Sequence, residues 1–182
     1  HHAAMPYSEI SEFTNNLYRE HGVAAKALIF LILTASRTNE IIRAEWQEID
    51  FLSRSWNIPA IRMKSNRNHR VPLSQPACNL LKQMGQDTPS QYIFYNNVSK
   101  RPLSNMAMLK TLKARRPTLT VHGFRSTFRT WAAEKTDVQN DVIEAALAHI
   151  VSNKVIAAYQ RGDLFEKRLK LMNDWATFLD VR

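Results

Sequence analysis

The chain has 182 residues, of which 45% are hydrophobic and 23% charged, and its formal net charge is +9. A chain of this size builds one compact core, and its positive charge favours an anionic partner such as nucleic acid or a membrane surface. The single cysteine, Cys78, excludes an intrachain disulfide and a cysteine-based zinc framework.

No stretch has the features of a membrane span or a signal peptide. The longest apolar run, VAAKALIFLILTA, is interrupted by Lys26 and is shorter than the roughly 20 residues that a spanning helix needs. The chain starts with HHAAM, in which residues 1–4 look like the remnant of an expression tag, and continues with polar residues. We therefore expect a cytoplasmic protein without a membrane partner.

Helical periodicity dominates the N-terminal part of the chain. Apolar residues recur at helical spacing over residues 8–20 and 23–35. The segment SRTNEIIRAEW then restarts a helix, for which Ser36 or Thr38 is the expected N-cap.

A short β region follows between Ile49 and Leu73. Residues that favour strands are separated there by polar turns at LSRS and SNRN, and Pro59 and Pro72 stand at the expected strand ends. This pattern predicts an antiparallel sheet of about three strands.

The remainder of the chain is mainly helical. Helical spacing is found in LSQPACNLLKQMG, SNMAMLKTLKAR, HGFRSTFRTWAAEK, NDVIEAALAHI, NKVIAAYQR and LFEKRLKLMNDWATFL. One further strand is expected at YIFYN. No repeat or long linker divides the chain, so we predict one α+β domain that is mainly α-helical with a small antiparallel sheet.

Positive charge gathers in two segments. Residues 61–70 hold four Lys/Arg and no acid, and residues 101–135 hold eight Lys/Arg against Glu134 alone. Such runs are usually solvated faces, and this simpler interpretation stays open for both segments.

The stretch VHGFRSTFRTWAAE combines cations with core residues. His122 and Arg125 are three positions apart and share one side of a helix, whereas Phe124 and Phe128 form its apolar face. A buried arginine without a paired acid is costly unless an anion meets it, and the planar guanidinium suits phosphate oxygens. H-x-x-R alone is a weak signal, because a helix histidine is more often a packing residue.

Five short motifs follow one another in a recognisable order. They are ASRTNEI with Arg37 and Glu40, RMKSNRNHRVPLS with Lys64, HGFR, ALAHI with His149, and AAYQR with Tyr159. This order resembles the catalytic domain of tyrosine recombinases, and HGFRSTFRTWAAE and LMNDWA are similar to integrases of satellite phages and bacterial genomic islands. The resemblance covers residues 8–179 and implies the tyrosine recombinase catalytic fold.

The resemblance implies a site-specific recombinase that cuts and rejoins DNA through a covalent 3′-phosphotyrosine intermediate, without metal, cofactor or ATP. Tyr159 would be the nucleophile, and His122 would accept its proton. Lys64 would protonate the departing 5′-oxygen.

The same resemblance assigns the remaining site residues. Arg37 and Arg125 would hold the non-bridging phosphate oxygens, and His149 would donate a further hydrogen bond. Glu40 would brace the site. Contact with the DNA phosphates, or support for it, would come from Arg62, Arg67 and Arg129.

Each assignment has a structural alternative. Arg37 could pair with Glu40 on a surface helix, and Lys64 competes with its basic neighbours Arg62 and Arg67. His149 could simply end its helix, and His69 has no role in the recombinase pattern. Arg129 could pair with Glu134. The other candidate nucleophiles are Tyr7, Tyr18, Tyr92 and Tyr95.

Two positions depart from the recombinase pattern. Many members have T-G-x-R and L-G-H, whereas this chain has TASR and LAH, so that Ala35 and Ala148 stand where glycine is common. The departures concern turn geometry rather than the reacting groups.

Residues 5–182 are expected to be a C-terminal catalytic domain whose N-terminal arm-binding and core-binding domains are absent from this sequence. The implied partners are double-stranded DNA attachment sites, further subunits in a tetramer on DNA, a host DNA-bending protein and an excisionase; the isolated domain is expected to be monomeric. Two other functions stay open: a type IB topoisomerase or telomere resolvase with the same chemistry, and a DNA-binding module without chemistry.

Overall fold

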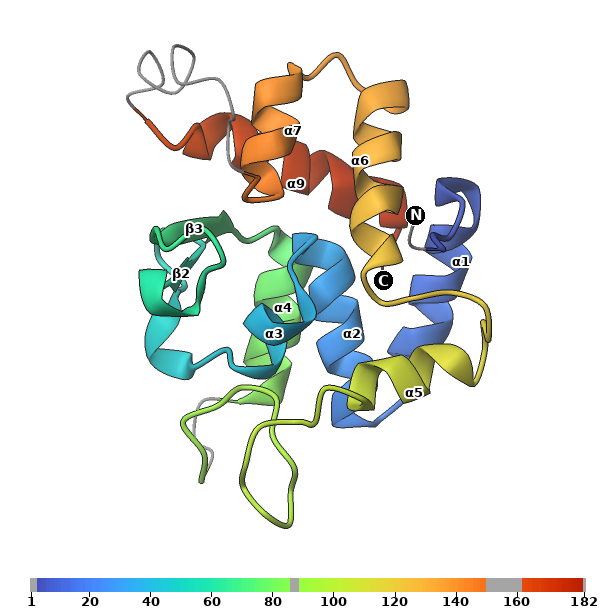
Figure 1. The fold of residues 1–182 in the computed structure, drawn as a ribbon, viewed down its shortest axis with the longest axis vertical. Helices are drawn as coiled ribbons and strands as arrows, with labels where there is room; N and C mark the ends of the chain where they lie inside the picture. The colour runs from blue at the N-terminus through green and yellow to red at the C-terminus, as the bar shows by residue number, and fades with distance from the viewer. Residues whose placement is uncertain (1–2, 86–88, 150–161, 182) are drawn as a thin grey trace.

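The structure, a computed structural model, describes residues 3–85, 89–149 and 162–181. Helices make up about half of this part, and a small sheet lies at one side (Figure 1). The elements in chain order are α1 (Tyr7–Tyr18), α2 (Val23–Thr34), α3 (Thr38–Ile42), η1 (Trp46–Glu48), β1 (Ile49–Asp50), β2 (Ser55–Ile58), η2 (Ala60–Arg62), β3 (His69–Pro72), α4 (Gln75–Met84), α5 (Ala107–Lys113), α6 (Gly123–Lys135), α7 (Asn140–Ala146) and α9 (Phe165–Leu179). The predicted α+β fold is confirmed.

Helix α2 forms the centre of the core. Every position from Ala27 to Thr34 is buried, because the sequence ALIFLILT presents apolar side chains in all directions. The helix packs against α1, α3, α4, α5, α6 and α9 (Figure 1). Trp175 of α9 adds a hydrogen bond of 2.8 Å from its indole Nε1 to the Ile32 carbonyl. These contacts hold the end of α2 that leads into Arg37.

The sheet has the strand order β1-β2-β3, and both neighbouring pairs are antiparallel. Trp56 of β2 pairs in register with Val71 of β3, and both side chains are buried. Pro59 follows β2 directly and Pro72 ends β3, as predicted. The connection between these two strands carries Lys64.

Aromatic residues fix α6 on two sides. Phe124 stacks against Phe13 of α1 with ring centroids 5.6 Å apart. The ring centroids of Trp131 and Trp175 of α9 are 4.8 Å apart, and Phe128 contacts both tryptophans. The predicted apolar face of this helix is confirmed, and its packing determines the direction of the polar side chains.

The start of the described chain crosses the beginning of α6. The Thr120 amide donates to the Ala3 carbonyl at 3.2 Å, and Thr127 Oγ1 donates to the Met5 carbonyl at 2.6 Å. A Cβ atom on Gly123 would lie 2.3 Å from the Ala3 oxygen, well inside van der Waals contact. The glycine of HGFR is therefore needed for this close approach.

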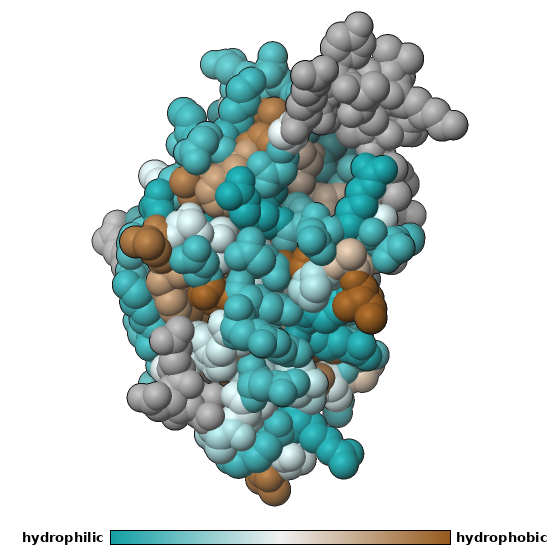
Figure 2. Space-filling view, turned by 90° about the vertical axis from the view of Figure 1, so that its left-hand side faces the viewer, coloured by the Kyte–Doolittle hydropathy of each residue, from teal (hydrophilic) through white to brown (hydrophobic). Residues whose placement is uncertain are grey.

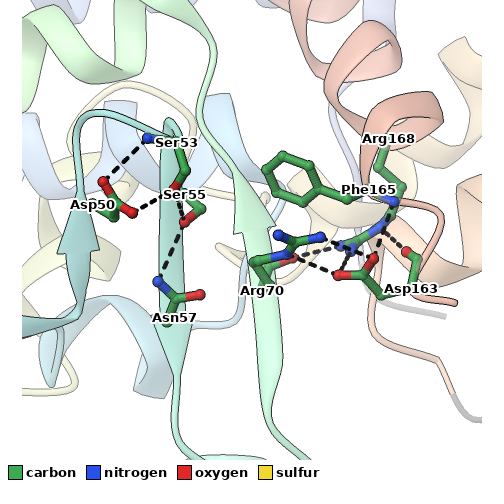
Figure 3. Close-up of polar contacts among 8 residues, drawn as sticks. All are labelled: Asp50, Ser53, Ser55, Asn57, Arg70, Asp163, Phe165 and Arg168. Atoms are coloured by element: carbon green, nitrogen blue, oxygen red, sulfur yellow. Dashed lines mark hydrogen bonds and ion pairs between the residues drawn. The ribbon is translucent and has the colours of Figure 1, made fainter.

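An ion-pair cluster joins β3 to the beginning of α9 (Figure 3). Arg168 is almost completely buried, and its Nη2 lies 3.0 Å from Asp163 Oδ2. Arg70 of β3 holds the same carboxylate oxygen through Nε at 3.0 Å, and its guanidinium lies 3.8 Å from the centre of the Phe165 ring. Arg168 Nη1 also donates to the Arg70 carbonyl at 2.7 Å. The cluster fixes the first turn of α9 against the sheet.

The molecular surface is mostly hydrophilic on the side of the sheet. Figure 2 shows this face, on which hydrophobic residues are scattered among polar ones. Among the described residues, the exposed large hydrophobic side chains are those of Leu52, Ile61, Val98 and Met106. Among the described helices, none combines the length and the apolar character that crossing a membrane requires.

The expected strand at YIFYN is wrong. Tyr92 and Tyr95 make only isolated bridges, to Glu45 and Pro102. Ile93 and Phe94 between them are fully buried, so the strand-like composition reflects core packing rather than a ladder of paired strands.

The helix predicted from SRTNEIIRAEW is shorter than expected and has another N-cap. Only Thr38–Ile42 is α-helical, and Arg37 rather than Ser36 or Thr38 occupies the N-cap. The reason is that Glu40, in the first turn, accepts a hydrogen bond from the Arg37 amide at 2.8 Å. The helix predicted at NKVIAAYQR lies outside the described residues.

Candidate active site

Arg37 connects the beginning of α3 to the loop after α7. Its Nη1 donates to Glu40 Oε1 at 2.9 Å, and its Nη2 donates to the carbonyls of Leu147 and Ala148 at 3.4 and 3.3 Å. The pairing with Glu40 agrees with the simpler alternative for Arg37. The contacts with the distant loop go beyond a surface ion pair and place the guanidinium between two parts of the molecule.

Arg125 projects from the first turn of α6 into the interior and is only 4% exposed. Its Nη1 donates to the Ala35 carbonyl and its Nη2 to the Leu147 carbonyl, both at 2.6 Å. Its buried Nε has no hydrogen-bond partner among the described residues, and no ion pair within them includes Arg125. Burial and the charge of Arg37 lower the pKa of Arg125 to about 10, so the side chain stays charged at neutral pH.

The two arginines converge on one peptide group. Both donate to the Leu147 carbonyl, which directly follows α7, so their guanidinium groups lie side by side. Like charges held together in the interior repel each other unless an anion lies between them. Two adjacent guanidinium groups can therefore bind the oxygens of a phosphate or of a similar oxyanion.

Two strained turns direct carbonyl groups at these arginines. Ala35 ends α2 with φ 50°, and Ala148 follows α7 with φ 49°, both in the left-handed region. The Ala35 oxygen accepts from Arg125, and the Ala148 oxygen accepts from Arg37. An alanine in this region costs about 1 kcal/mol relative to glycine. The departures at TASR and LAH thus keep the turns and add backbone strain.

His149 links Arg125 to an acid of α7. Its Nε2 lies 3.1 Å from Arg125 Nη2, and its Nδ1 lies 2.6 Å from Glu144 Oε2. The second Glu144 oxygen accepts from Arg129 Nε at 2.7 Å. Burial alone would raise the pKa of Glu144, but the hydrogen bonds from His149 and Arg129 outweigh it and lower the pKa. The carboxylate is therefore ionised at neutral pH.

His122 and Lys64 lie at the same pocket as Arg37. The pocket is lined by Arg37, Thr38, Asn39, Glu40, Ile61, Arg62, Met63, Lys64 and His122. Lys64 is exposed in the connection between β2 and β3, and His122 is exposed at the N-cap of α6. The structure thus brings into one region Arg37, Lys64, His122, Arg125 and His149.

The additional basic residues differ in their surroundings. Arg62 is mostly buried, pairs with Glu48 and donates to the Arg43 carbonyl, so it holds the β2–β3 connection in place. Arg67 is exposed in the same connection. Arg129 binds Glu144, not Glu134 as its alternative predicted.

His69 lies among the arginines, although the recombinase pattern gives it no role. It is half-buried on β3. Burial, followed by the charges of Arg168, Arg37 and Arg125, lowers the pKa of His69 to about 3. Its ring is therefore neutral at physiological pH and can exchange hydrogen bonds without adding charge.

The predicted nucleophile, Tyr159, lies outside the described residues. The pocket beside Arg37 is not lined by any of the other tyrosines, Tyr7, Tyr18, Tyr92 and Tyr95. Tyr7 donates its hydroxyl to Glu134 at 2.8 Å, and burial raises the pKa of Tyr18 to about 12. Tyr7 and Tyr18 are therefore poor nucleophiles, because the first phenol is hydrogen-bonded to a carboxylate and the second is hard to deprotonate.

Sequence reasoning missed Glu144, because no motif singled it out. The only available signal was its place five residues before the ALAH histidine, on the helix that ends there. As for metal ions, the ranges 3–85, 89–149 and 162–181 contain no group of three or more His, Cys, Asp or Glu side chains that could bind one.

Comparison with known proteins finds relatives whose sequences match most of this chain. The model of the phage integrase family matches residues 5–163. Prophage integrase IntA of Escherichia coli strain K12 is 40% identical over 149 residues, which cover 80% of this chain and 36% of IntA. Prophage integrase IntZ of the same strain is 35% identical over 184 residues, which cover 99% of this chain and 46% of IntZ. The chain spans less than half the length of either relative.

A solved structure of a lambda integrase(75-356) dimer bound to a COC′ core site has the same fold. The TM-score is 0.62 at 15% sequence identity, and the match covers 89% of this chain and 60% of that chain. At such an identity the likeness concerns the fold, and it agrees with the fold that the motif order predicts.

Proposed function

Since this chain belongs to the phage integrase family, we propose that it is the catalytic part of a site-specific tyrosine recombinase. Residues 5–182 would break and rejoin duplex DNA through a covalent 3′-phosphotyrosine intermediate. The biological outcome would be the integration or excision of a prophage or genomic island, since both relatives are prophage integrases by name.

The observation that carries the proposal is the buried guanidinium of Arg125, which lies beside Arg37 without an acid of its own among the described residues. The non-bridging oxygens of a DNA phosphodiester would supply the missing anion. Their negative charge grows as phosphorus becomes five-coordinate, so fixed cations stabilise the transition state more than the ground state. Glu40 supports this role, because it holds Arg37 at 2.9 Å.

In the proposed reaction the Tyr159 oxygen forms a bond to phosphorus while the bond from phosphorus to the 5′-oxygen breaks. His122 accepts the phenolic proton, and Lys64 gives a proton to the departing 5′-oxygen. The ester bond energy is kept in the intermediate, so attack by a 5′-hydroxyl rejoins the strand and releases the tyrosine without ATP. The common pocket of Arg37, Lys64 and His122 supports this division of roles.

The proposed partner is a double-stranded DNA attachment site, in the cytoplasm and at the nucleoid. The net charge of +9 and the fold shared with a lambda integrase dimer bound to a core site support DNA as the ligand. Four subunits would assemble on DNA, and a host DNA-bending protein and an excisionase would set the direction of the reaction. Upstream DNA-binding domains would complete the grip on the duplex.

The test is the formation of a covalent adduct with a nicked duplex that carries an attachment sequence. The unaltered chain is expected to form an adduct that survives denaturing gel electrophoresis. Tyr159→Phe is expected to bind the duplex and to form none, because only the phenolic oxygen is removed. Adduct formation by Tyr159→Phe would place the nucleophile elsewhere, and normal binding without any adduct in the unaltered protein would favour a DNA-binding module. Strand exchange between two defined sites by the full-length protein separates a recombinase from a topoisomerase or telomere resolvase.

A further inference from the structure

Glu144 has two partners that belong to the candidate site. One carboxylate oxygen lies 2.6 Å from His149 Nδ1, and the other accepts from Arg129 Nε at 2.7 Å. The His149 amide also donates to the Glu144 carbonyl at 3.0 Å. Residue 144 therefore holds residue 149 through both its side chain and its main chain.

The proton on His149 can be assigned from these partners. A guanidinium has only N–H donors, so His149 Nε2 must accept the 3.1 Å hydrogen bond from Arg125 Nη2. In the neutral ring the proton is then on Nδ1, from which it is donated to Glu144 Oε2. Arg129, Glu144, His149 and Arg125 thus form one continuous chain of hydrogen bonds.

These hydrogen bonds matter because, within the part of the protein that the structure describes, little else fixes the imidazole ring. The His149 side chain is 41% exposed, and the preceding residue, Ala148, is in the strained left-handed conformation. The ionised carboxylate at Nδ1 sets both the tautomer and the ring orientation, as carboxylates do for catalytic and metal-bound histidines. The orientation stays the same whether Nε2 accepts from Arg125 or, once protonated, donates to a phosphate oxygen.

We propose that Glu144 is a positioning residue for DNA cleavage, which holds His149 by Nδ1 and directs Nε2 at Arg125 and the phosphate that Arg125 binds. The inference rests on the proposed function, because it assigns Glu144 an effect on the cleavage step. Glu144 itself touches neither the DNA nor the nucleophile. It acts through His149, and this indirect action can be measured.

The kinetic test compares Glu144→Ala, Glu144→Gln, His149→Ala and the double variant Glu144→Ala/His149→Ala in single-turnover cleavage of the nicked duplex. Glu144→Ala is expected to slow cleavage by about 10- to 100-fold, the range found when a carboxylate that orients a functional histidine is removed. The double variant is expected to be no slower than His149→Ala, because Glu144 has no effect once its histidine is gone. Independent, multiplying losses would overturn the proposal.

The matched control is Glu12→Gln, which removes one exposed carboxylate on α1 and so changes the net charge as Glu144→Gln does. Its cleavage rate is expected to equal that of the unaltered protein. Glu144→Gln keeps the size of the side chain and a carbonyl acceptor, so it should retain more activity than Glu144→Ala. Equal losses in Glu144→Gln and Glu12→Gln would mean that only net charge matters, which contradicts the proposal.

A spectroscopic measurement separates this inference from the proposed function. ¹⁵N chemical shifts of the His149 ring are expected to show the Nδ1-protonated tautomer in the unaltered protein and a mixture of tautomers in Glu144→Ala, with the thermal unfolding midpoint checked in parallel. The measurement needs no DNA, so it stays informative if no covalent adduct is formed. An unchanged tautomer in a folded Glu144→Ala variant would overturn the positioning role. A missing adduct would overturn the proposed function, and with it the effect of Glu144 on cleavage, but not the orientation of His149 by Glu144.

Discussion

Arg125 and Arg168 are both buried arginines, but their surroundings differ. They are 4% and 1% exposed, and burial is the main reason why the pKa of each falls to about 10. Arg168 meets the Asp163 carboxylate at 3.0 Å and donates to the carbonyls of Asp163 and Arg70 at 2.6 and 2.7 Å. Arg125 meets the carbonyls of Ala35 and Leu147 and the Nε2 atom of His149, and its Nε has no partner in the described part of the chain.

The difference agrees with the proposed roles, in which Arg168 holds the fold together and Arg125 binds a phosphate. A buried charge with a complete set of partners stabilises the elements that supply them, here β3 and the first turn of α9. A buried charge with neutral partners and a free donor is stabilised further only when an anion arrives. The degree of burial does not distinguish Arg125 from Arg168, whereas their ion-pair and hydrogen-bond partners do.

Arg125→Met should give the largest effect, and it should appear in catalysis. Methionine fills a similar space without charge, so the non-bridging oxygens lose one of their two guanidinium groups. We expect cleavage of a nicked duplex to slow by about 100- to 1000-fold, the scale of a lost oxyanion donor. The free energy of unfolding should change by less than about 1 kcal/mol, because removing the cost of burying a charge without a paired acid offsets the hydrogen bonds that the Ala35 and Leu147 carbonyls lose. Near-normal single-turnover cleavage would contradict the role of Arg125.

Arg168→Met should give the next largest effect, and it should appear in stability. The change leaves the carbonyls of Arg70 and Asp163 without their donor, and we expect a loss of about 2 to 3 kcal/mol in urea unfolding. Asp163 is partly exposed, so water compensates for some of the lost ion pair. Arg70→Met is the control, because Arg70 is itself about half exposed and should cost less. Equal unfolding free energies for Arg168→Met and Arg125→Met would remove the contrast between the two arginines.

The pH dependence of stability tests His69, whose pKa is lowered by burial and then by the charges of Arg168, Arg37 and Arg125. Its pKa in the folded state is about 3, below the ordinary 6.5, so between these values the unfolded chain binds more protons. Stability should therefore be complete above pH 6.5 and fall as the pH decreases toward 3, by at most about 1.4 kcal/mol per pH unit for one proton. Urea unfolding at pH 7, 6 and 5 is expected to show a shallower decline for His69→Gln than for the unaltered chain. Parallel declines would mean that His69 titrates normally.

Replacing the strained alanines should give the smallest effect. Ala35→Gly and Ala148→Gly each remove a left-handed alanine, and we expect each to stabilise the fold by up to about 1 kcal/mol in urea unfolding. Ala133→Gly, at an exposed position within α6, should destabilise by about the same amount. Destabilisation by all three glycines would show that Ala35 and Ala148 are unstrained in solution.

Much of the fold could be predicted because side-chain patterns encode it. The period of the HGFR helix and its aromatic face predicted that α6 is buried on one side, and Pro59 and Pro72 marked the strand ends. YIFYN misled because residues that favour strands also fill cores, as Ile93 and Phe94 do.

The residues of the candidate site could be predicted from the sequence only in part, for another reason. Motif order named Arg37, Lys64, His122, Arg125 and His149, which the structure brings together, and it named Tyr159, whose role stays a prediction. It could not name the Leu147 carbonyl, since every residue has the same main-chain oxygen, or Glu144, whose partner is set by how α7 lies against α6.

The oxygens that orient the two site arginines come from the main chain at Ala35, Leu147 and Ala148. A substitution at any of these positions exchanges a side chain and leaves the acceptor where it was. Residues at these positions can therefore change with little effect on the guanidinium groups, provided that the new residue tolerates the backbone conformation, which is left-handed at Ala35 and Ala148. Distant homologues with different residues at these positions can therefore keep the same arrangement of the two arginines.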